Sequence, residues 1–296
     1  MSYSIQHIKK IRLTAFQIKV IALVCMTLDH LAAFGFEIPI IERYETYLRA
    51  IGRIAAPLFL FLLVQSIRHT RSKPKFVLRL YLAGMCVGLF DTAMNMLTGE
   101  ALGYRTPGNI IFTFFYVALY IVLIEGLISS GKKRNFRVLA LLVLALALSL
   151  VPTIFGNAIY DAIPVNSTAS IFLLPMGIRP SLIPSFNDVD YGIGFILLGI
   201  ILYFAKTNGR QCWAFALFCV FCYIGAWVEM WYPDLRMIET YGLVMVFFDR
   251  FQCRMVFALP FMLLYNGERG KKCKWFFYWY YPLHRQLIFI ISALVT

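Results

Sequence analysis

The run FQIKVIALVCMTLDHLAAF extends from Phe16 to Phe34. Most of its nineteen side chains are apolar, and the run is long enough for one helical crossing of a bilayer. A helix needs about 18 to 20 residues of this kind to span roughly 30 Å of hydrocarbon. The run is therefore predicted to be a membrane-spanning helix.

The remainder of the chain repeats this pattern. Of the 296 residues, 60% are hydrophobic and 15% are charged, and the mean hydropathy is +0.73, which excludes an ordinary soluble protein. The apolar runs are continuous and do not alternate, so they indicate helices and not a β-barrel. We predict an all-α, polytopic integral membrane protein, with residues 1–296 as a single domain. Its nine spans are expected at 16–34, 50–67, 76–97, 109–128, 138–154, 191–204, 212–230, 241–265 and 276–295.

Charge in the connecting segments predicts the orientation. One alternating set of segments holds eighteen Lys and Arg residues, and the other set holds five. Basic residues accumulate on the cytoplasmic side of membrane proteins. The amino terminus is thus expected inside and the carboxyl terminus outside, in a multi-pass protein of the inner (cytoplasmic) membrane.

The net charge of +13 does not indicate nucleic-acid binding. The cations lie in short segments between apolar runs, where anionic lipid is the expected partner. Cys219 and Cys222 form a C-x-x-C pair inside a predicted helix, without a second pair or a nearby histidine. We therefore expect neither a metal site nor a disulfide framework.

The first predicted helix contains Lys19, Asp29 and His30, and ionisable groups at membrane depth are costly enough to suggest function. Lys19 and His30 are eleven residues apart, which is about 1,100° of helical rotation. The two side chains then share one face to within roughly 20° and lie about 16 Å apart along the axis. That face presents a cation near the inner side and an imidazole near the outer side.

Two later residues are also expected within the membrane. Arg53 enters from the outer side and is predicted to pair with Asp29, while His284 follows Pro282 inside the last span. A polar cluster that only packs helices together is the alternative explanation for Asp29, His30 and Arg53. Further ionisable candidates at depth are Asp91, Glu125, Asp190, Asp249, Arg250 and Arg254. Of these, Asp249, Arg250 and Arg254 could pair with one another, and Glu125 is expected to extend to the inner surface.

Several motifs together resemble the TraX family. They are MTLDH at 26–30, GRIAAP at 52–57, DYG at 190–192, YNG at 265–267 and YPLH at 281–284. The resemblance implies N-terminal acetylation of a pilin subunit during conjugative pilus assembly. The chain is also distantly similar to larger membrane acyltransferases, whose first helix carries a basic residue, ten residues and then a histidine. Lys19 and His30 match that spacing.

These features lead to the hypothesis of an acetyltransferase that uses cytosolic acetyl-CoA. Lys19 would hold phosphates, and His30 would act as general base on an acceptor amine or hydroxyl from the outer side. Arg53 would orient Asp29 or stabilise an oxyanion, and His284 would line the acceptor side. Direct transfer is favoured over an acetyl-histidine intermediate. The acceptor could be a pilin amino terminus or a cell-surface molecule.

Two other classes of function fit the same residues. Buried charges could form the path of a transporter or lipid flippase. They could also stabilise helix packing in a non-catalytic assembly protein. Transport would follow a membrane gradient and ignore acetyl-CoA, whereas an assembly protein would lose only abundance or partner binding when His30 or Arg53 is replaced.

Overall fold

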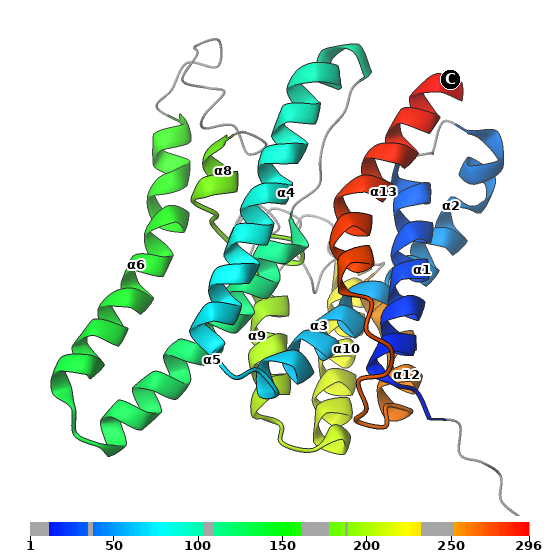
Figure 1. Ribbon diagram of the computed structural model, residues 1–296. Helices are drawn as coiled ribbons and strands as arrows, with labels where there is room; N and C mark the ends of the chain where they lie inside the picture. Colours follow the sequence, from blue (N-terminus) through cyan, green and yellow to red (C-terminus); the bar gives the residue numbers. More distant parts are fainter. Residues whose placement is uncertain are drawn as a thin grey trace, which may run out of the picture.

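The structure is a computed structural model that describes residues 12–34, 38–102, 109–161, 178–186, 189–231 and 252–295. Within these ranges the chain is helical, and the one β-type pairing is an isolated parallel bridge between Leu13 and Tyr265. The all-α class is confirmed (Figure 1). The helices are α1 (Ala15–Phe34), α2 (Pro39–Gly52), α3 (Ala55–Arg68), α4 (Lys73–Leu102), α5 (Ile110–Lys132), α6 (Phe136–Asp161), α8 (Ile178–Leu182), α9 (Gly192–Phe204), α10 (Asn208–Trp231), the 3-10 helix η2 (Gln252–Ala258), α12 (Leu259–Leu263) and α13 (Lys274–Val295).

Six helical segments of the described chain are long and apolar enough to cross a membrane, so the protein is a multi-pass membrane protein. They are Ala15–Ala33, Pro39–Arg68, Lys73–Met94, Ile110–Lys132, Phe136–Phe155 and Asn208–Val228. Two shorter apolar helices cover Gly192–Phe204 and Gln252–Leu263. In Figure 1, α1, α4, α6, α10 and α13 run up the page, and α3, α5, α9 and α12 run down it. The nine spans and the inside amino terminus remain predictions.

The second predicted span, 50–67, is not one straight helix. The chain turns at Arg53 and Ile54, which separates α2 from α3. Pro39 opens α2, where its missing N–H removes no helical hydrogen bond. Gly52 directly precedes the turn, and Pro57, the third residue of α3, has no N–H to donate to the carbonyl oxygen of Arg53. Of the eighth predicted span, 241–265, only the part from Gln252 onward lies within the described residues.

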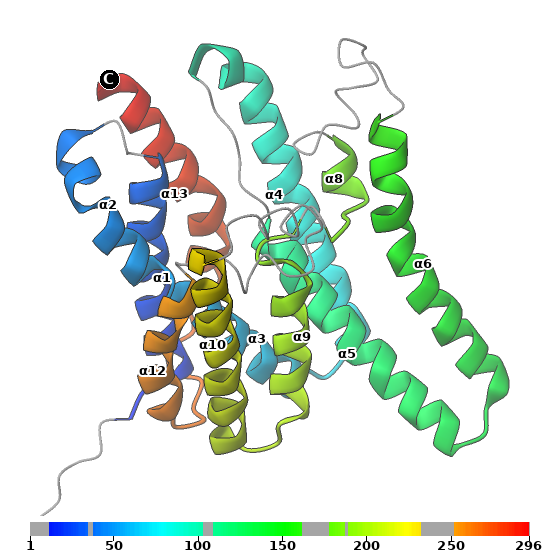
Figure 2. The same ribbon diagram turned by 180° about the vertical axis from the view of Figure 1, so that it is seen from behind.

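The core forms around α3, whereas α6 is exposed along its most apolar stretch. Ten of the fourteen residues of α3 are buried, whereas no residue in the most apolar window of α6 is buried. Both views place α6 at one edge of the molecule, and from behind α10 lies between α12 and α9 (Figure 2). Helix α3 is therefore the element that positions its neighbours.

The end of α3 and the start of α4 contact α5 and the end of α9 at one end of the molecule. Arg68, at the end of α3, donates hydrogen bonds to the carbonyl oxygens of Leu202 (3.2 Å) and Ala205 (2.7 Å). The Lys73 ammonium contacts the Glu125 carboxylate at 2.6 Å and the Tyr203 hydroxyl at 2.6 Å. Glu125 thus forms an ion pair, where the sequence predicted an extended side chain at the surface. We call this end of the molecule, and the end of the cavity that points to it, the basic end, because the Lys- and Arg-rich segments that are predicted to face the cytoplasm lie there.

Candidate functional site

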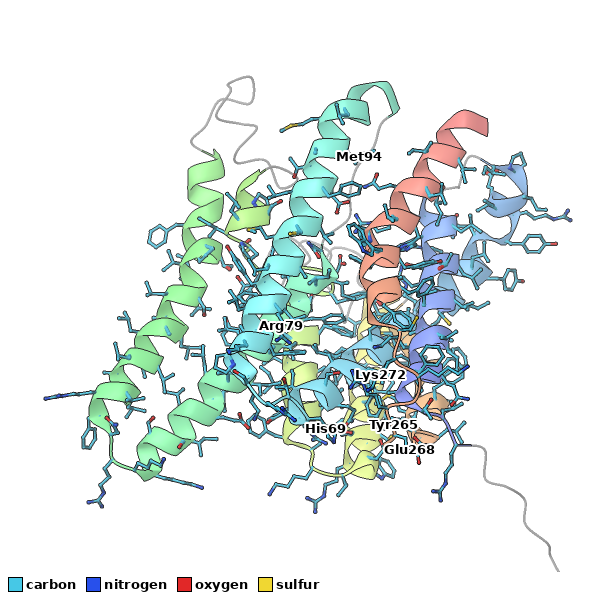
Figure 3. All side chains as sticks on the ribbon, viewed as in Figure 1. His69, Arg79, Met94, Tyr265, Glu268 and Lys272 are labelled. Atoms are coloured by element: carbon cyan, nitrogen blue, oxygen red, sulfur yellow. The ribbon has the colours of Figure 1, made fainter. Side chains whose placement is uncertain are left out.

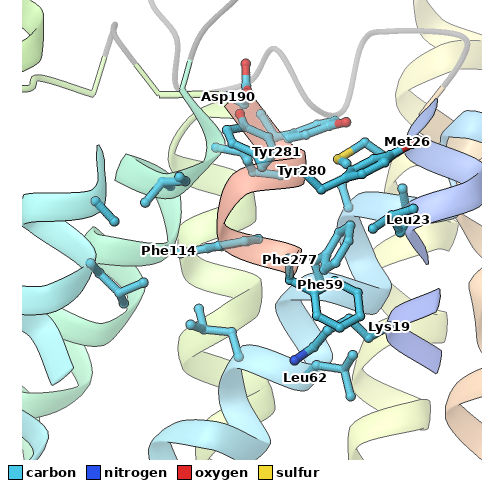
Figure 4. Close-up of a pocket in the computed structure, with 18 of the residues that line it drawn as sticks. Lys19, Leu23, Met26, Phe59, Leu62, Phe114, Asp190, Phe277, Tyr280 and Tyr281 are labelled. Atoms are coloured by element: carbon cyan, nitrogen blue, oxygen red, sulfur yellow. The ribbon is translucent and has the colours of Figure 1, made fainter. Parts of the chain in front are cut away.

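A cavity of about 320 Å³ lies between α1, α3, α4, α5, α13 and the start of α9. Its wall is mainly apolar, with contributions from Leu23, Phe59, Leu62 and Phe114 (Figure 4). Polar groups gather at its two ends. Lys19 and Ser66 line the basic end, and the other end is lined by Asp29, His30, Asp190, Tyr191, Tyr280 and Tyr281. A concave apolar site with a few polar groups is typical of small-molecule binding.

Lys19 and His30 both line this cavity, as their spacing on one helical face predicted. The Lys19 ammonium lies 4.9 Å from the centre of the Phe277 ring, in cation–π contact with α13. Figure 4 shows Lys19, Phe277 and Phe59 together at the lower end of the cavity and Asp190 with Tyr281 at its upper end. The cavity therefore connects a cation at one end with an imidazole near the other.

His30 and His284 form a direct pair across α1 and α13. Nδ1 of His30 lies 2.6 Å from Nε2 of His284, and the ring centres are 4.8 Å apart at an interplanar angle of 22°. His284 is buried, and its Nδ1 lies 2.7 Å from the carbonyl oxygen of Tyr280. The two histidines at membrane depth are thus brought into contact from positions 254 residues apart.

The hydrogen bonds assign the protons of this histidine pair. A carbonyl oxygen can only accept, so Nδ1 of His284 carries a proton that it donates to Tyr280. In the neutral ring, Nε2 of His284 is then an acceptor, and Nδ1 of His30 donates to it. The lone pair of His30 is therefore on Nε2, which is the form that a general base requires.

Tyr280 contacts both His284 and helix α1. Its ring stacks on His284 with centres 4.9 Å apart and an interplanar angle of 10°. Its hydroxyl lies 2.7 Å from Oγ1 of Thr27, and that threonine hydroxyl also contacts the carbonyl oxygen of Leu23 at 2.8 Å. Because Thr27 uses its single proton on Leu23, the Tyr280 hydroxyl must be the donor to Thr27. Tyr280 therefore ties α13 to α1 one turn before His284.

Asp29 lies beside the histidines in a separate ion cluster. Its Oδ1 accepts hydrogen bonds from Arg49 at 3.1 Å and from Arg53 at 3.3 Å. The predicted Asp29–Arg53 pair is therefore present, and Arg49 is a second partner of the same carboxylate. A Cβ atom at Gly52 would overlap the Asp29 side chain. Glycine at this position lets α2 approach α1 closely enough for both arginines to reach the carboxylate.

A third polar cluster was missed by the sequence interpretation. Arg285, with 1% of its surface exposed, contacts the Asp91 carboxylate at 3.2 Å, and Gln286 donates to the same carboxylate at 2.9 Å. Arg285 also donates to the Tyr281 hydroxyl at 3.3 Å. Asp91 was recognised as an ionisable residue at membrane depth. Its partner Arg285 directly follows His284 and meets the same criterion.

The remaining ionisable candidates have other roles or lie outside the described residues. Asp190 lines the cavity, and its backbone carbonyl oxygen accepts from Thr113 at 2.9 Å. Arg254 donates to the carbonyl oxygen of Thr46 at 3.2 Å, while Asp249 and Arg250 lie outside the described ranges. Among the residues that the structure describes, no three His, Cys, Asp or Glu side chains are grouped to hold a metal ion.

Comparison with known proteins adds two matches. The model of the TraX protein family matches residues 15–173, a range that includes Lys19, Asp29, His30 and Arg53 and ends before α13. Over 129 residues the chain is 32% identical to the probable fimbrial assembly protein FimC, serogroup H1, of Dichelobacter nodosus, covering 42% of this chain and 52% of that protein. The chain thus spans about half the length of this curated relative. No solved structure matches.

Proposed function

This chain belongs to the TraX protein family, and from that premise we propose that it is a membrane acyltransferase that moves an acetyl group from acetyl-CoA to an acceptor amine or hydroxyl. The observation that carries the proposal is the His30–His284 pair at one end of a cavity whose other end holds Lys19. In this pairing the basic lone pair of His30 is on Nε2, and His30 lines the cavity of about 320 Å³.

The cavity suits the extended shape of acetyl-CoA. Lys19 and His30 are eleven residues apart on α1, which corresponds to about 16 Å, close to the length of a pantetheine arm. The apolar wall between them matches the thin, uncharged arm, and the Lys19 ammonium supplies a charge for the diphosphate. The thioester would then lie near His30.

In the proposed reaction His30 removes a proton from the acceptor as its nitrogen or oxygen attacks the thioester carbonyl carbon. A new C–N or C–O bond forms, and the tetrahedral intermediate carries the negative charge on the carbonyl oxygen. The C–S bond then breaks, and the thiolate of CoA takes the proton from His30. His284 accepts the hydrogen bond from Nδ1 of His30 throughout, so it stabilises the imidazolium that forms.

Asp29 and Arg53 are assigned positioning roles in this proposal. The Asp29 carboxylate is engaged by two arginines, and Arg53 is directed at that carboxylate. The cluster fixes α2 and α3 against the turn of α1 that carries His30. Asp190, at the same end of the cavity, faces the side from which the acceptor would arrive.

The acceptor is an amine or hydroxyl that is presented from the outer side of the membrane. The TraX resemblance implies a pilin amino terminus, and the D. nodosus relative is named a probable fimbrial assembly protein. A pilin amine, presented from the outer side of the inner membrane, is therefore the first acceptor to try. A hydroxyl of a cell-surface molecule is the second.

The test is transfer of labelled acetyl from acetyl-CoA by the purified full-length protein in detergent. Loss of a general base typically lowers the rate by about 10²- to 10⁴-fold, so His30→Ala should lose both transfer to the acceptor and hydrolysis of acetyl-CoA. His69→Ala is the matched control, because His69 is exposed at the end of α3. A folded His30→Ala protein with normal transfer would contradict the assignment. Wild-type protein that does not bind acetyl-CoA would favour a transporter.

One observation favours a second candidate function, a non-catalytic assembly factor. The buried carboxylates of Asp29 and Asp91 are each matched by arginines from other helices, an arrangement that also serves helix packing. Under that function, His30→Ala and Arg53→Ala would alter only the amount of protein in the membrane or its binding to a pilin subunit. Quantifying both proteins by immunoblot alongside the transfer assay separates the two candidates.

A further inference from the structure

Residues 264–273, which join α12 to α13, form a loop that is fastened to the start of α1. Leu13 N–H donates to the carbonyl oxygen of Leu264 at 2.8 Å, and Asn266 N–H donates back to that of Leu13 at 3.0 Å. Ala15 N–H bonds to the carbonyl oxygen of Glu268 at 2.8 Å, and Phe16 N–H to that of Arg269 at 3.1 Å. We call residues 264–273 the clasp loop, because this run of backbone bonds fixes its position.

Two glycines give the clasp loop its path. Gly267 has φ +82° and Gly270 has φ +70°, a region that side chains rarely adopt. A Cβ atom at Gly270 would also lie 2.7 Å from Oγ1 of Thr14, whereas one at Gly267 would have nothing within 4 Å. Gly270 is therefore required both by its backbone conformation and by its close approach to α1.

The clasp loop carries an excess of positive charge. Arg269, Lys271 and Lys272 are all exposed, and the loop's one carboxylate, on Glu268, accepts from the Asn266 amide at 2.9 Å. The loop leads directly into α13, whose Phe277 contacts Lys19. The loop therefore lies beside α1 and α13, the helices whose Lys19 and Phe277 line the basic end of the cavity.

Figure 3 labels two exposed cations on this part of the molecule. In that view Lys272 of the clasp loop and Arg79 of α4 lie on either side of α3. Both side chains are exposed.

We infer that the clasp loop binds the 3′-phosphorylated adenosine end of coenzyme A, with Arg269 and Lys272 as the phosphate ligands. The inference rests on the proposed function, because it assumes that the pantetheine arm enters the cavity. With the arm between His30 and Lys19, the diphosphate reaches Lys19 and the nucleotide must lie outside the cavity. Guanidinium and ammonium groups are the usual ligands of a phosphate monoester.

A lipid headgroup offers the same phosphate chemistry, so the source of the phosphate has to be tested. The position of the clasp loop favours the nucleotide. Backbone bonds to residues 13–16 hold the loop beside the start of α1, the helix that carries Lys19, and binding to a lipid surface does not require such a fixed position. By comparison, the exposed cations Lys132 and Lys133 lie at the end of α5 and directly after it, where the Lys133 N–H bonds to the carbonyl oxygen of Ser129 in the same helix.

The experiment measures binding of CoA and of 3′-dephospho-CoA to the full-length protein in lipid-free detergent. The double variant Arg269→Ala/Lys272→Ala should lose at least about tenfold in CoA affinity, since each charged hydrogen bond contributes on this scale. Its affinity for 3′-dephospho-CoA should change much less, so the preference for the 3′-phosphate disappears. The control Lys132→Ala/Lys133→Ala removes the same charge and should bind like wild type.

Three outcomes would overturn the inference, and they can be told apart. If the double variant binds CoA like wild type while acetyl transfer persists, the clasp loop is not the site and the proposed function stands. If wild type binds no CoA, both fail together. If the double variant loses only binding to phosphatidylglycerol vesicles, the cations serve lipid.

A glycine pair gives an independent test of the clasp. Gly270→Ala and Gly267→Ala both place a side chain at positive φ, but only Gly270→Ala forces the loop away from Thr14. Gly270→Ala should raise KM for acetyl-CoA by several-fold more than Gly267→Ala, with kcat unchanged at saturation. Equal KM values for two folded variants would show that the clasp does not position the phosphate ligands.

Discussion

The two ends of the cavity differ in what their charges contact. At the histidine end, Asp29 is paired with Arg49 and Arg53, and Asp91 is paired with Arg285. At the basic end, Lys19 and the clasp-loop cations outnumber the nearby carboxylates. Paired charges hold helices in place, whereas an excess of one sign is available to a ligand of the other sign. Substitutions at the histidine end should therefore affect stability and kcat, and those at the basic end should affect KM.

The largest effect is expected from Arg285→Ala. The substitution leaves Asp91 buried without its cation, and breaking a buried pair costs about 3 to 5 kcal/mol. Thermal unfolding in detergent should show a much lower transition temperature. The double variant Asp91→Leu/Arg285→Met removes both charges and should recover most of the loss. If Arg285→Ala unfolds like wild type, the pair does not hold α13 against α4.

His284→Ala should have the next largest effect, on the chemical step. Without His284 the hydrogen bond that fixes the tautomer of His30 is lost, and kcat should fall by about 10²-fold with KM little changed. His284→Gln should retain more activity, because an amide oxygen can accept from Nδ1 of His30. Steady-state kinetics of both variants measure this difference. An equal loss in the two would argue against the tautomer assignment.

The two arginines that contact Asp29 should differ in how much each stabilises the protein, and both effects should be smaller than the preceding ones. The Arg53 side chain is 8% exposed and that of Arg49 is 27% exposed, so the Arg53 contact is less screened by solvent. Arg53→Ala should lower the free energy of unfolding by about 1 to 3 kcal/mol, and Arg49→Ala by less than about 1 kcal/mol. Chemical denaturation of the two variants checks the order. The reverse order would place the stabilising contact at Arg49.

Lys19→Ala should produce the smallest effect and the one most specific to the basic end. Loss of one phosphate contact should raise KM for acetyl-CoA by roughly fivefold to tenfold and leave kcat within about twofold of wild type. Lys19→Arg keeps the charge and should largely restore KM. A fall in kcat without a change in KM would place Lys19 in the chemical step and remove the distinction between the two ends.

Much of the histidine end could be predicted from the sequence, because membrane depth makes an ionisable residue conspicuous. Asp29, His30, Arg53 and His284 were found in this way, and helical spacing placed Lys19 on the face of His30. The contact between His30 and His284 could not be predicted, because nothing local in the sequence specifies which helices are neighbours.

Other features were missed for different reasons. Arg285 was passed over in a run dominated by aromatic residues, although its neighbour His284 was selected. The turn at Arg53 and Ile54 is flanked by Gly52 and Pro57, but the apolar run across it suggested a continuous helix. The clasp loop depends on backbone bonds to residues 13–16, and such bonds leave no side-chain pattern to read.

The pairing of α1 with α13 also has a consequence for biosynthesis. Residues 13–16 and His30 are made early in translation, but their partners in the clasp loop and in α13 are made about 250 residues later. Contacts this distant in sequence form late, after the intervening helices have entered the membrane. A ribosome-bound chain would hold Lys19 and His30 without the rest of the site, so the proposed transfer activity should appear only after α13 is inserted. The timing of α13 synthesis would then set when the site becomes active.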